Sequence, residues 1–359
     1  MNGPAVSTPR GVLLRGRVWP GGHPGYADGV VVLDADGRVS AMGPADAIDV
    51  PDAVPTIGGD ACWVGPGIID AHVHLAFGSP AAVVAGSVTS VRDLGAPLAL
   101  AAQWRTTTQP ARSPHVSVAG PILTAPGGYP SQGWGRDGFA MFVADPAGAG
   151  VAVRSLAGSV DVIKIALEPA GGPLPSKATV QAVVAAAHDV GLAVIAHALT
   201  VDTVRTALRA GVDELAHIPL EVLPADVIEQ IAAADMLVVS TIQTMVAGDR
   251  RAGANVQANA AALCAAGVRL CYGSDLGNAG TSPGVDPREL RELAAAGLGA
   301  AGALHAATVA SASAHGITGG RGVLVLDELA DVVVLTGDPL QEPELWQSPA
   351  AVFVAGRRT

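Results

Sequence analysis

The chain has 359 residues, a net charge of −11 and a half-apolar composition in which aromatic residues make up only 3%. This length accommodates one barrel-sized domain with a small appendage, or two medium-sized domains. The acidic balance, with no basic patch that includes aromatic residues, argues against nucleic acid and anionic membranes as partners.

Apolar patterning and cysteine usage indicate the compartment. No uninterrupted apolar run of about 18 residues or more predicts a membrane span, and residues 1–10 lack the apolar core of a secretory signal. The three cysteines, Cys62, Cys264 and Cys271, lie in apolar surroundings and form no Cys-x-x-Cys pair. Such usage is typical of thiols in a reducing compartment. We expect a cytoplasmic protein with no membrane partner.

Both ends of the chain contain short strand patterns separated by turns, including the hairpin signal Asp34-Ala35-Asp36-Gly37. Because chain ends often lie near each other, we expect them to pair. The sequence therefore predicts one small β-sandwich domain made of residues 1–61 and 318–359. Its expected strands are Gly11–Trp19, Val30–Asp34, Val39–Met42, Ala330–Leu335 and Ala351–Val354.

Residues 62–317, between these ends, alternate apolar strand patterns with alanine-rich helical patterns. Eight strands over this length are the repeat of a (β/α)8 TIM barrel in the α/β class. A doubly wound open sheet is the alternative, but it usually needs a Gly-x-Gly-x-x-Gly loop where this chain has His72-Val73-His74. The expected strands are Trp63–Ile69, Val88–Arg92, His115–Val118, Val160–Ile165, Ala193–His197, Glu214–His217, Leu237–Thr241 and Val268–Gly273.

Two histidines separated by one residue follow the first of these strands. Residues i and i+2 of a strand point to the same face, so His72 and His74 would present two imidazoles side by side. Neutral imidazole is a strong ligand for divalent transition metals. Taken alone, the pair also fits two ordinary polar histidines at a strand terminus.

Further titratable side chains lie at or near the ends of later strands, where the active site of a barrel is built. They are Lys164 in the fourth strand, His197 and His217 at the ends of the fifth and sixth, and Asp275 after the eighth. Each has a structural explanation by itself, such as a snorkelling lysine or a helix N-cap aspartate. Their occurrence together on one rim favours a metal centre.

This set of side chains resembles the binuclear-metal branch of the amidohydrolase superfamily, and more closely its imidazolonepropionase-related and prolidase-like members. The segment Ser87–Gly95, the twenty-residue gap from His197 to His217 and the tail Ala330–Pro339 extend the resemblance over nearly the whole chain. The likeness is specific for the superfamily and the metal centre, and weak for the substrate.

The resemblance implies two divalent metal ions, usually zinc, although manganese, cobalt or iron also accept oxygen and nitrogen ligands. By that likeness, His72, His74 and Asp275 hold the more buried ion, and His197 and His217 hold the second. Lys164 would bridge both ions as a carboxylated lysine, a carbamate formed from its amine and CO₂. An unmodified ammonium cannot ligate a cation, and an apolar strand favours the loss of its charge.

The implied activity is that of a metal-dependent hydrolase that cleaves the amide (C–N) bond of a small molecule, such as a dipeptide, an N-acyl amino acid or a cyclic amide. A water that bridges two ions becomes a hydroxide nucleophile near neutral pH. Asp275 would act as general acid/base, taking its proton and returning it to the leaving group. We expect a small-molecule substrate and a homo-oligomeric protein.

Three alternatives remain open. A lactonase or esterase would use the same site. A mononuclear deaminase usually carries a His-x-x-Glu arrangement, and this chain has Thr200 and Leu220 at the corresponding positions after His197 and His217. A non-enzymatic scaffold protein would be expected to lack some of the ligands.

The loop of residues 124–136, after the third strand, concentrates scarce aromatic side chains beside an arginine. We expect Tyr129, Trp134 and Arg136 to contact substrate, with a structural loop carrying a hydrophobic lid as the alternative. Related enzymes often have a histidine in place of Tyr129. Dipeptidase-like members also tend to have a tyrosine shortly after the strand-five histidine, where this chain has Ala198-Leu199-Thr200. Without that hydroxyl, a free dipeptide carboxylate is less well provided for, although Arg136 could substitute.

Arg92 and Asp93 follow one another at the end of the second strand. Their charges are opposite and their surroundings apolar. We expect them to form a structural ion pair and not part of a binding site.

Overall fold

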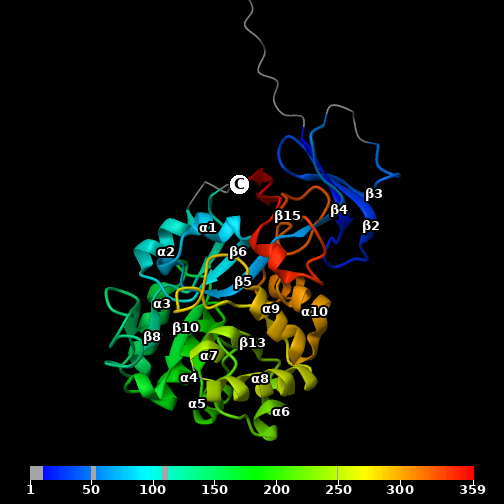
Figure 1. Cartoon of the computed structure of the whole chain (residues 1–359). Helices are drawn as coiled ribbons and strands as arrows, with labels where there is room; N and C mark the ends of the chain where they lie inside the picture. The colour runs from blue at the N-terminus through cyan, green and yellow to red at the C-terminus, as the bar shows by residue number, and fades with distance from the viewer. Residues whose placement is uncertain (1–10, 50–53, 107–111, 249) are drawn as a thin grey trace, which may run out of the picture.

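The computed structural model describes residues 11–49, 54–106, 112–248 and 250–359, which form a β domain and a barrel (Figure 1). Residues 1–10, where no secretory signal is expected, lie outside the described residues. The predicted fold class is confirmed: a (β/α)8 barrel carries a small β domain built from both ends of the chain. The expected domain boundaries at residues 61 and 318 stay a prediction.

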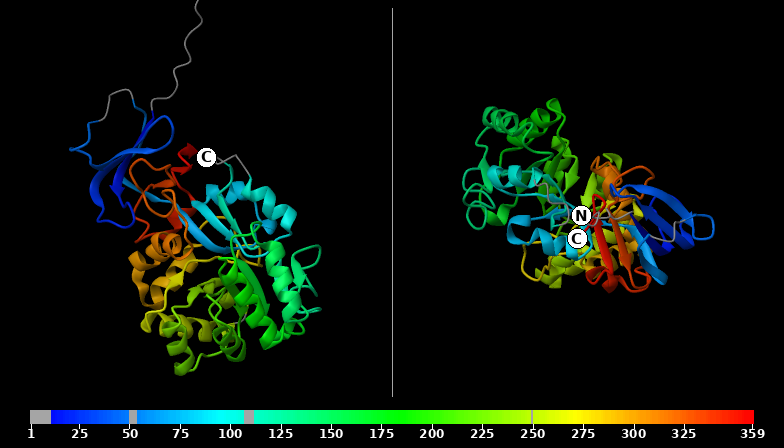
Figure 2. Two further views of the ribbon diagram at one scale, coloured as in Figure 1. Left: turned by 180° about the vertical axis from the view of Figure 1, so that it is seen from behind. Right: turned by 90° about the horizontal axis from the view of Figure 1, so that it is seen from above.

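The β domain is a seven-stranded sheet with the order β17-β16-β15-β4-β1-β2-β3. Strand β15 lies antiparallel to both β4 and β16, so the last strands of the chain complete a sheet begun by the first. Figure 2 shows these blue and red segments side by side in both views. The strands are β1 (Val12–Val18), β2 (Tyr26–Leu33), β3 (Val39–Pro44), β4 (Thr56–Pro66), β15 (Val332–Leu335), β16 (Ala351–Val354) and β17 (Arg357–Arg358).

The barrel strands pair in parallel in chain order, except for the short strand β9, which among the described strands pairs only with β8, at the edge of its sheet. The third one is interrupted: its first part, β7, pairs with β6, and its second part, β8, pairs with β10. The ring closes between the last and first strands, where the Ala71 amide donates to the Tyr272 carbonyl at 2.9 Å. The strands are β5 (Ile68–Val73), β6 (Val88–Asp93), β7 (His115–Val118), β8 (Ile122–Thr124), β9 (Ala140–Phe142), β10 (Ile163–Leu167), β11 (Val194–Ala198), β12 (Glu214–Leu215), β13 (Leu237–Val239) and β14 (Leu270–Cys271).

Helices cover the outside of the barrel, and α1, α3, α4, α5 and α9 begin at a residue whose side chain caps the first turn. Helix α5 begins with a capping box in which Thr200 and Thr203 bond each other's backbone amides, and ends at Gly211 in the left-handed conformation. Within the described residues, no helix is both long and apolar enough to cross a membrane. The helices are α1 (Pro80–Ala85), α2 (Leu98–Arg105), α3 (Pro146–Leu156), α4 (Lys177–Asp189), α5 (Val201–Ala210), α6 (Ala225–Ala233), α7 (Ile242–Gly248), α8 (Arg250–Ala265), α9 (Pro287–Leu293), α10 (Gly299–Ala306) and α11 (Val309–Ala314), with short turns η1 (Leu75–Phe77), η3 (Pro169–Gly171), η4 (Ala294–Leu298) and η5 (Pro343–Gln347).

The prediction of a single first strand over Trp63–Ile69 is wrong. Its first half belongs to β4 of the β domain, and the barrel strand β5 starts at Ile68. The chain changes sheets at Gly67, where a Cβ atom would lie 2.2 Å from Thr89 Cγ2. A buried apolar run has the same pattern whether it occupies one sheet or two, so the break was not visible in the pattern. His72 therefore lies inside a strand and not after it.

The expected ion pair between Arg92 and Asp93 is also wrong. Adjacent strand residues point to opposite faces. The two terminal guanidinium nitrogens of Arg92, Nη1 and Nη2, donate hydrogen bonds to the Glu214 carboxylate at 2.8 and 3.1 Å. Asp93 instead accepts hydrogen bonds from the amides of Leu75 at 2.7 Å and Gly95 at 3.1 Å. The aspartate thus fixes the loops that leave β5 and β6, beside the barrel rim.

Glu214→Gln is expected to lower the free energy of unfolding by about 3 kcal/mol at pH 7. Burial alone would raise the pKa of Glu214, but the Arg92 guanidinium and the His315 imidazole lower it from 4.5 to about 2. The carboxylate therefore contributes its stability above pH 4.5 and loses it as the pH falls toward 2. Denaturant unfolding of both proteins over this pH range measures the difference.

A double variant, Arg92→Met with Glu214→Leu, is the control because it removes both charges at once. It should be close to wild-type stability, since replacing a buried pair by apolar residues is often neutral. A Glu214→Gln protein as stable as wild type at pH 7 would contradict the role of this pair.

Candidate active site

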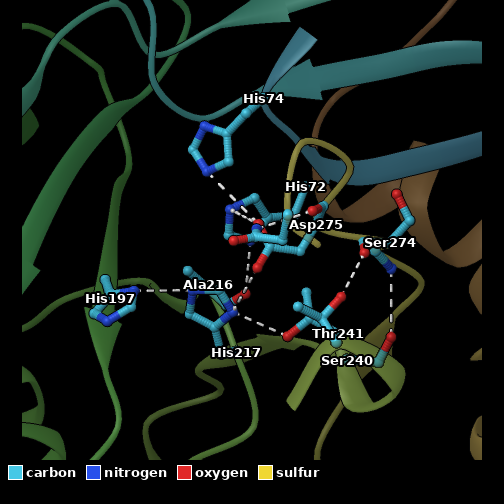
Figure 3. A network of polar contacts seen from close by, with 12 residues as sticks. His72, His74, His197, Ala216, His217, Ser240, Thr241, Ser274 and Asp275 are labelled. Carbon is cyan, nitrogen blue, oxygen red and sulfur yellow. Dashed lines mark hydrogen bonds and ion pairs between the residues drawn. The ribbon is translucent and has the colours of Figure 1, made fainter. Parts of the chain in front are cut away.

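Six predicted metal ligands meet at one cavity of about 400 Å³, beyond the carboxyl ends of the barrel strands. The structure places all six on its lining, as expected where parallel strands end on one rim. Figure 3 shows His72, His74 and His217 around Asp275, with His197 joined to His217. The six residues are His72, His74, Lys164, His197, His217 and Asp275.

His72, His74 and Asp275 form the tightest group, with ligand atoms within 4.8 Å of one another. The Nε2 atoms of His72 and His74 lie 3.4 and 3.6 Å from Asp275 Oδ1. His72 Nδ1 donates to the Ala216 carbonyl at 2.9 Å, which leaves the lone pair of Nε2 facing the aspartate. In the described part of the chain, neither this Nε2 nor Asp275 Oδ1 has a hydrogen-bond partner, although both are buried. One nitrogen and one oxygen atom therefore have lone pairs without a partner, and such atoms can ligate a divalent metal ion.

His197 and His217 form a second group on the other side of the cavity. His197 Nδ1 lies 3.0 Å from His217 Nε2, and His217 Nδ1 lies 2.9 Å from Thr241 Oγ1. His217 Nδ1 is also 3.9 Å from Asp275 Oδ2, so the two groups share the aspartate. The outer nitrogen of His197 contacts Glu168 Oε2 at 3.3 Å.

Burial keeps all four histidines neutral. Burial and then the charge of Lys164 lower the pKa of His74 from 6.5 to about 3. The pKa values of His72, His197 and His217 are lowered too, with burial as the largest cause. Neutral imidazoles keep the lone pairs that a metal needs.

Lys164 lies in β10 among buried residues, and its amine is unusual because it is buried too. Its side chain is buried, and its Nζ has no hydrogen-bond partner within the described residues. Burial lowers its pKa from 10.5 to about 7, although Asp275 and Glu214 favour the charged form. An amine that readily loses its proton can react as a nucleophile with CO₂.

Asp275 is held in a conformation that few residues adopt. Its φ of 54° lies in the left-handed region, and its carbonyl accepts a hydrogen bond from Asn278 Nδ2 at 3.0 Å. Such backbone strain often marks functional residues. Burial raises the pKa of the carboxyl from 3.8 to about 7, despite the nearby charge of Lys164. The group can therefore hold or release a proton near neutral pH.

Asp70 and Glu168 support this site and were not predicted. Asp70 Oδ1 accepts from the amides of His72 at 3.2 Å and Ser274 at 3.0 Å, which ties β5 to the turn that carries Asp275. Glu168 contacts His197. Each lies within four residues of a predicted ligand, which is the signal that could have identified them.

The loop of residues 124–136 reaches the cavity only in part. Tyr129 and Trp134 line it, and Trp134 Nε1 donates to the Tyr129 hydroxyl at 3.2 Å. Arg136 does not line it: its side chain is exposed and bonds the Gln132 carbonyl at 3.1 Å. The lining residues missed by the sequence follow other strands, and they include Phe77, Leu220, Met245 and Asn278.

Solved structures with the same fold include several hydrolases. A candidate prolidase from Bifidobacterium longum is 24% identical, with a TM-score of 0.82 over 98% of this chain and 95% of that one. A Xaa-Pro dipeptidase with bound methionine in the active site is 20% identical, with a TM-score of 0.83 over 97% and 99%. An A. niger ochratoxinase is 18% identical, with a TM-score of 0.79 over 97% and 95%. At these identities the likeness is one of fold.

A search of curated proteins gives no match. The family description "Amidohydrolase family" matches residues 63–359, which include the whole barrel and all six predicted ligands. The predicted resemblance is thus confirmed at the level of the family, and a metal-dependent hydrolase is the activity that goes with it. The chain belongs to the amidohydrolase family.

Proposed function

We propose that the protein hydrolyses an amide (C–N) bond of a small molecule at a centre of two divalent ions. The observation that carries this proposal is the meeting of four neutral histidines, a buried amine and a carboxyl in one cavity, with unpartnered atoms at His72, Lys164 and Asp275. A purely structural cluster would be expected to satisfy these polar atoms.

In this proposal His72, His74 and Asp275 would hold one zinc ion, and His197 and His217 would hold the other. Lys164, which lines the same cavity, would be carboxylated on Nζ and supply oxygen ligands. When bound, such ions lower the pKa of water and polarise a substrate carbonyl. The donor set of nitrogen and oxygen atoms suits zinc, and manganese or cobalt to a lesser extent.

Asp275 moves the proton. Its buried carboxyl takes the proton of the attacking water and delivers it to the leaving nitrogen. Two hydrogen bonds hold the backbone of Asp275 and so keep its carboxyl aimed at the reacting atoms. Asn278 Nδ2 donates to the Asp275 carbonyl, and the Asp275 amide donates to the His72 carbonyl at 2.9 Å. Amide hydrolysis depends on this delivery because, without a proton, the nitrogen would have to leave as a strongly basic anion.

Metal removal and reconstitution test the proposal. We expect about two zinc ions per chain by elemental analysis, loss of amide hydrolysis on chelation, and its return when zinc is added. The assay uses dipeptides, N-acyl amino acids, neutral amides, cyclic amides and lactones. Hydrolysis that survives complete metal removal would contradict the proposal. Cleavage of lactones alone would show that the enzyme is a lactonase and would contradict amide hydrolysis.

A further inference from the structure

An aromatic wall stands over one side of the metal-ligand cluster. We use this name for Phe77, Tyr129, Trp134 and Phe139, which are four of only twelve aromatic residues in the chain. Three of them line the cavity, and Phe139 backs them from behind. So uneven a distribution of a scarce residue type indicates that this wall has a specific task.

The rings of the wall pack on one another and on a ligand histidine. Phe77 stacks on Phe139 with ring centroids 5.5 Å apart. Trp134 forms a T-shaped contact with each of these two rings, with centroids 5.9 Å apart. Trp134 also lies 4.8 Å from the His74 ring, at an interplanar angle of 63°. These are favourable aromatic geometries that keep the rings rigid. The wall therefore continues from the mouth of the cavity down to the predicted ligands.

Phe77 shows that the wall is built to receive something apolar. Its side chain is 51% exposed although it lies in the turn directly after His74. An exposed aromatic residue at the rim of an apolar cavity is typical of a ligand-binding surface. Leu220, Met245 and Ile122 add to the apolar lining of the cavity.

The polar atoms of the cavity offer little to a charged substrate group. Among the described lining residues, the charged ones are Lys164 and Asp275, both assigned to the metal centre. Thr244 Oγ1 donates to the Ser274 carbonyl at 2.9 Å, and Asn278 Nδ2 donates to the Asp275 carbonyl. The Thr244 hydroxyl proton is therefore already used within the protein, and Asn278 keeps one N–H, which is an uncharged donor.

The Tyr129 hydroxyl, on the cavity lining, is a second uncharged donor. It accepts a hydrogen bond from Trp134 Nε1, and its own O–H can donate to a substrate. Two uncharged donors suit a neutral acceptor such as a carbonyl. They would leave the charge of a carboxylate uncompensated, and burying an unpaired carboxylate is strongly unfavourable.

We infer that the cavity selects uncharged amides that carry an aromatic ring beside the scissile bond, with the ring against Trp134 and Phe77. This inference rests on the proposed function and names its substrate class. A volume of about 400 Å³ accommodates one ring, the amide and a short alkyl group. Free dipeptides and N-acyl amino acids fit less well, because away from the metal centre their carboxylate would meet only apolar side chains and uncharged donors.

A matched pair of substrates tests the charge requirement. N-isopropylbenzamide and N-benzoyl-alanine differ only in a methyl group that replaces the carboxylate. We expect the zinc-loaded enzyme to favour the neutral amide by about 100-fold in kcat/KM. N-isopropylacetamide, which lacks the ring, should be a poorer substrate by about the same factor. Equal or better turnover of N-benzoyl-alanine would overturn the inference while leaving the proposed amide hydrolysis intact.

A second measurement separates binding from turnover. Calorimetry with the Asp275→Asn protein should show binding of N-isopropylbenzamide and none of N-benzoyl-alanine at the same concentration. Phe77→Leu should weaken that binding by about tenfold. Phe142→Leu is the matched control, because Phe142 is equally exposed, at 55%, but lies on β9 away from the cavity lining.

The outcomes distinguish the two proposals. Selective binding without hydrolysis by the wild-type enzyme would support the inference and contradict the proposed function. Equal weakening by Phe77→Leu and Phe142→Leu, or no weakening by either, would remove the aromatic wall from substrate selection.

Discussion

Asp275→Asn is expected to lower kcat for amide hydrolysis by a factor of about 1000 while the protein stays folded. Asparagine has nearly the same shape, and its carbonyl oxygen can still face His72 and His74. It cannot take up a proton from water or deliver one to the leaving nitrogen. Steady-state kinetics of the zinc-loaded variant, with metal content measured on the same sample, check the prediction.

Asp235→Asn is the matched control for this experiment. Asp235 also adopts a left-handed backbone conformation, with φ of 51°, but its side chain lies at the surface in a pair with Arg269. Its substitution should leave kcat unchanged. Near wild-type turnover by the Asp275→Asn enzyme would remove this residue from proton transfer. Loss of all bound metal would instead assign it to metal holding alone.

The sequence was informative about the site because of how a barrel is built. Parallel strands all end on one rim, so a polar residue at the end of an apolar run is placed by the fold itself. His197 and His217 lie twenty residues apart in the chain, yet their nitrogens are 3.0 Å apart. Recognising the strands was therefore enough to predict which side chains meet.

The parts that could not be predicted depend on register and on loops. Arg92 pairs with Glu214 across 122 residues, and only the relative tilt of distant strands decides that contact. The role of Phe77 depends on a three-residue turn that follows β5 directly. Arg136 lies in the expected loop, but the conformation of that loop directs it to solvent. Local sequence patterns carry no information about either kind of placement.

Asp70 and Asp275 also differ in a way that the local sequence does not reveal, namely in their hydrogen bonds. Both are buried carboxyls whose pKa burial raises to about 7. Asp70 accepts two backbone amides, whereas Asp275 keeps an unpartnered oxygen in the cavity. The two residues cannot be told apart by type or burial. Their hydrogen bonds make one a support and the other available for chemistry.

Lys164→Met is expected to abolish turnover and reduce bound zinc from about two ions per chain to one or none. Methionine is also a long, unbranched side chain, but it can neither be carboxylated nor ligate a hard divalent ion well. The metal-free variant should at the same time be more stable than wild type by about 1 to 3 kcal/mol, since a buried amine without a partner is replaced by an apolar group. Elemental analysis, kinetics and denaturant unfolding measure the three effects.

Lys177→Met is the control, because Lys177 is the other lysine of the chain and lies exposed at the start of α4. It should keep full activity and zinc. Isotopically labelled bicarbonate should give a carbamate signal in the wild-type and Lys177→Met proteins and none in Lys164→Met. Two tightly bound zinc ions in Lys164→Met would contradict a bridging lysine. A gain of apo stability together with the loss of metal would show that this buried amine is kept for the metal centre at the expense of the fold.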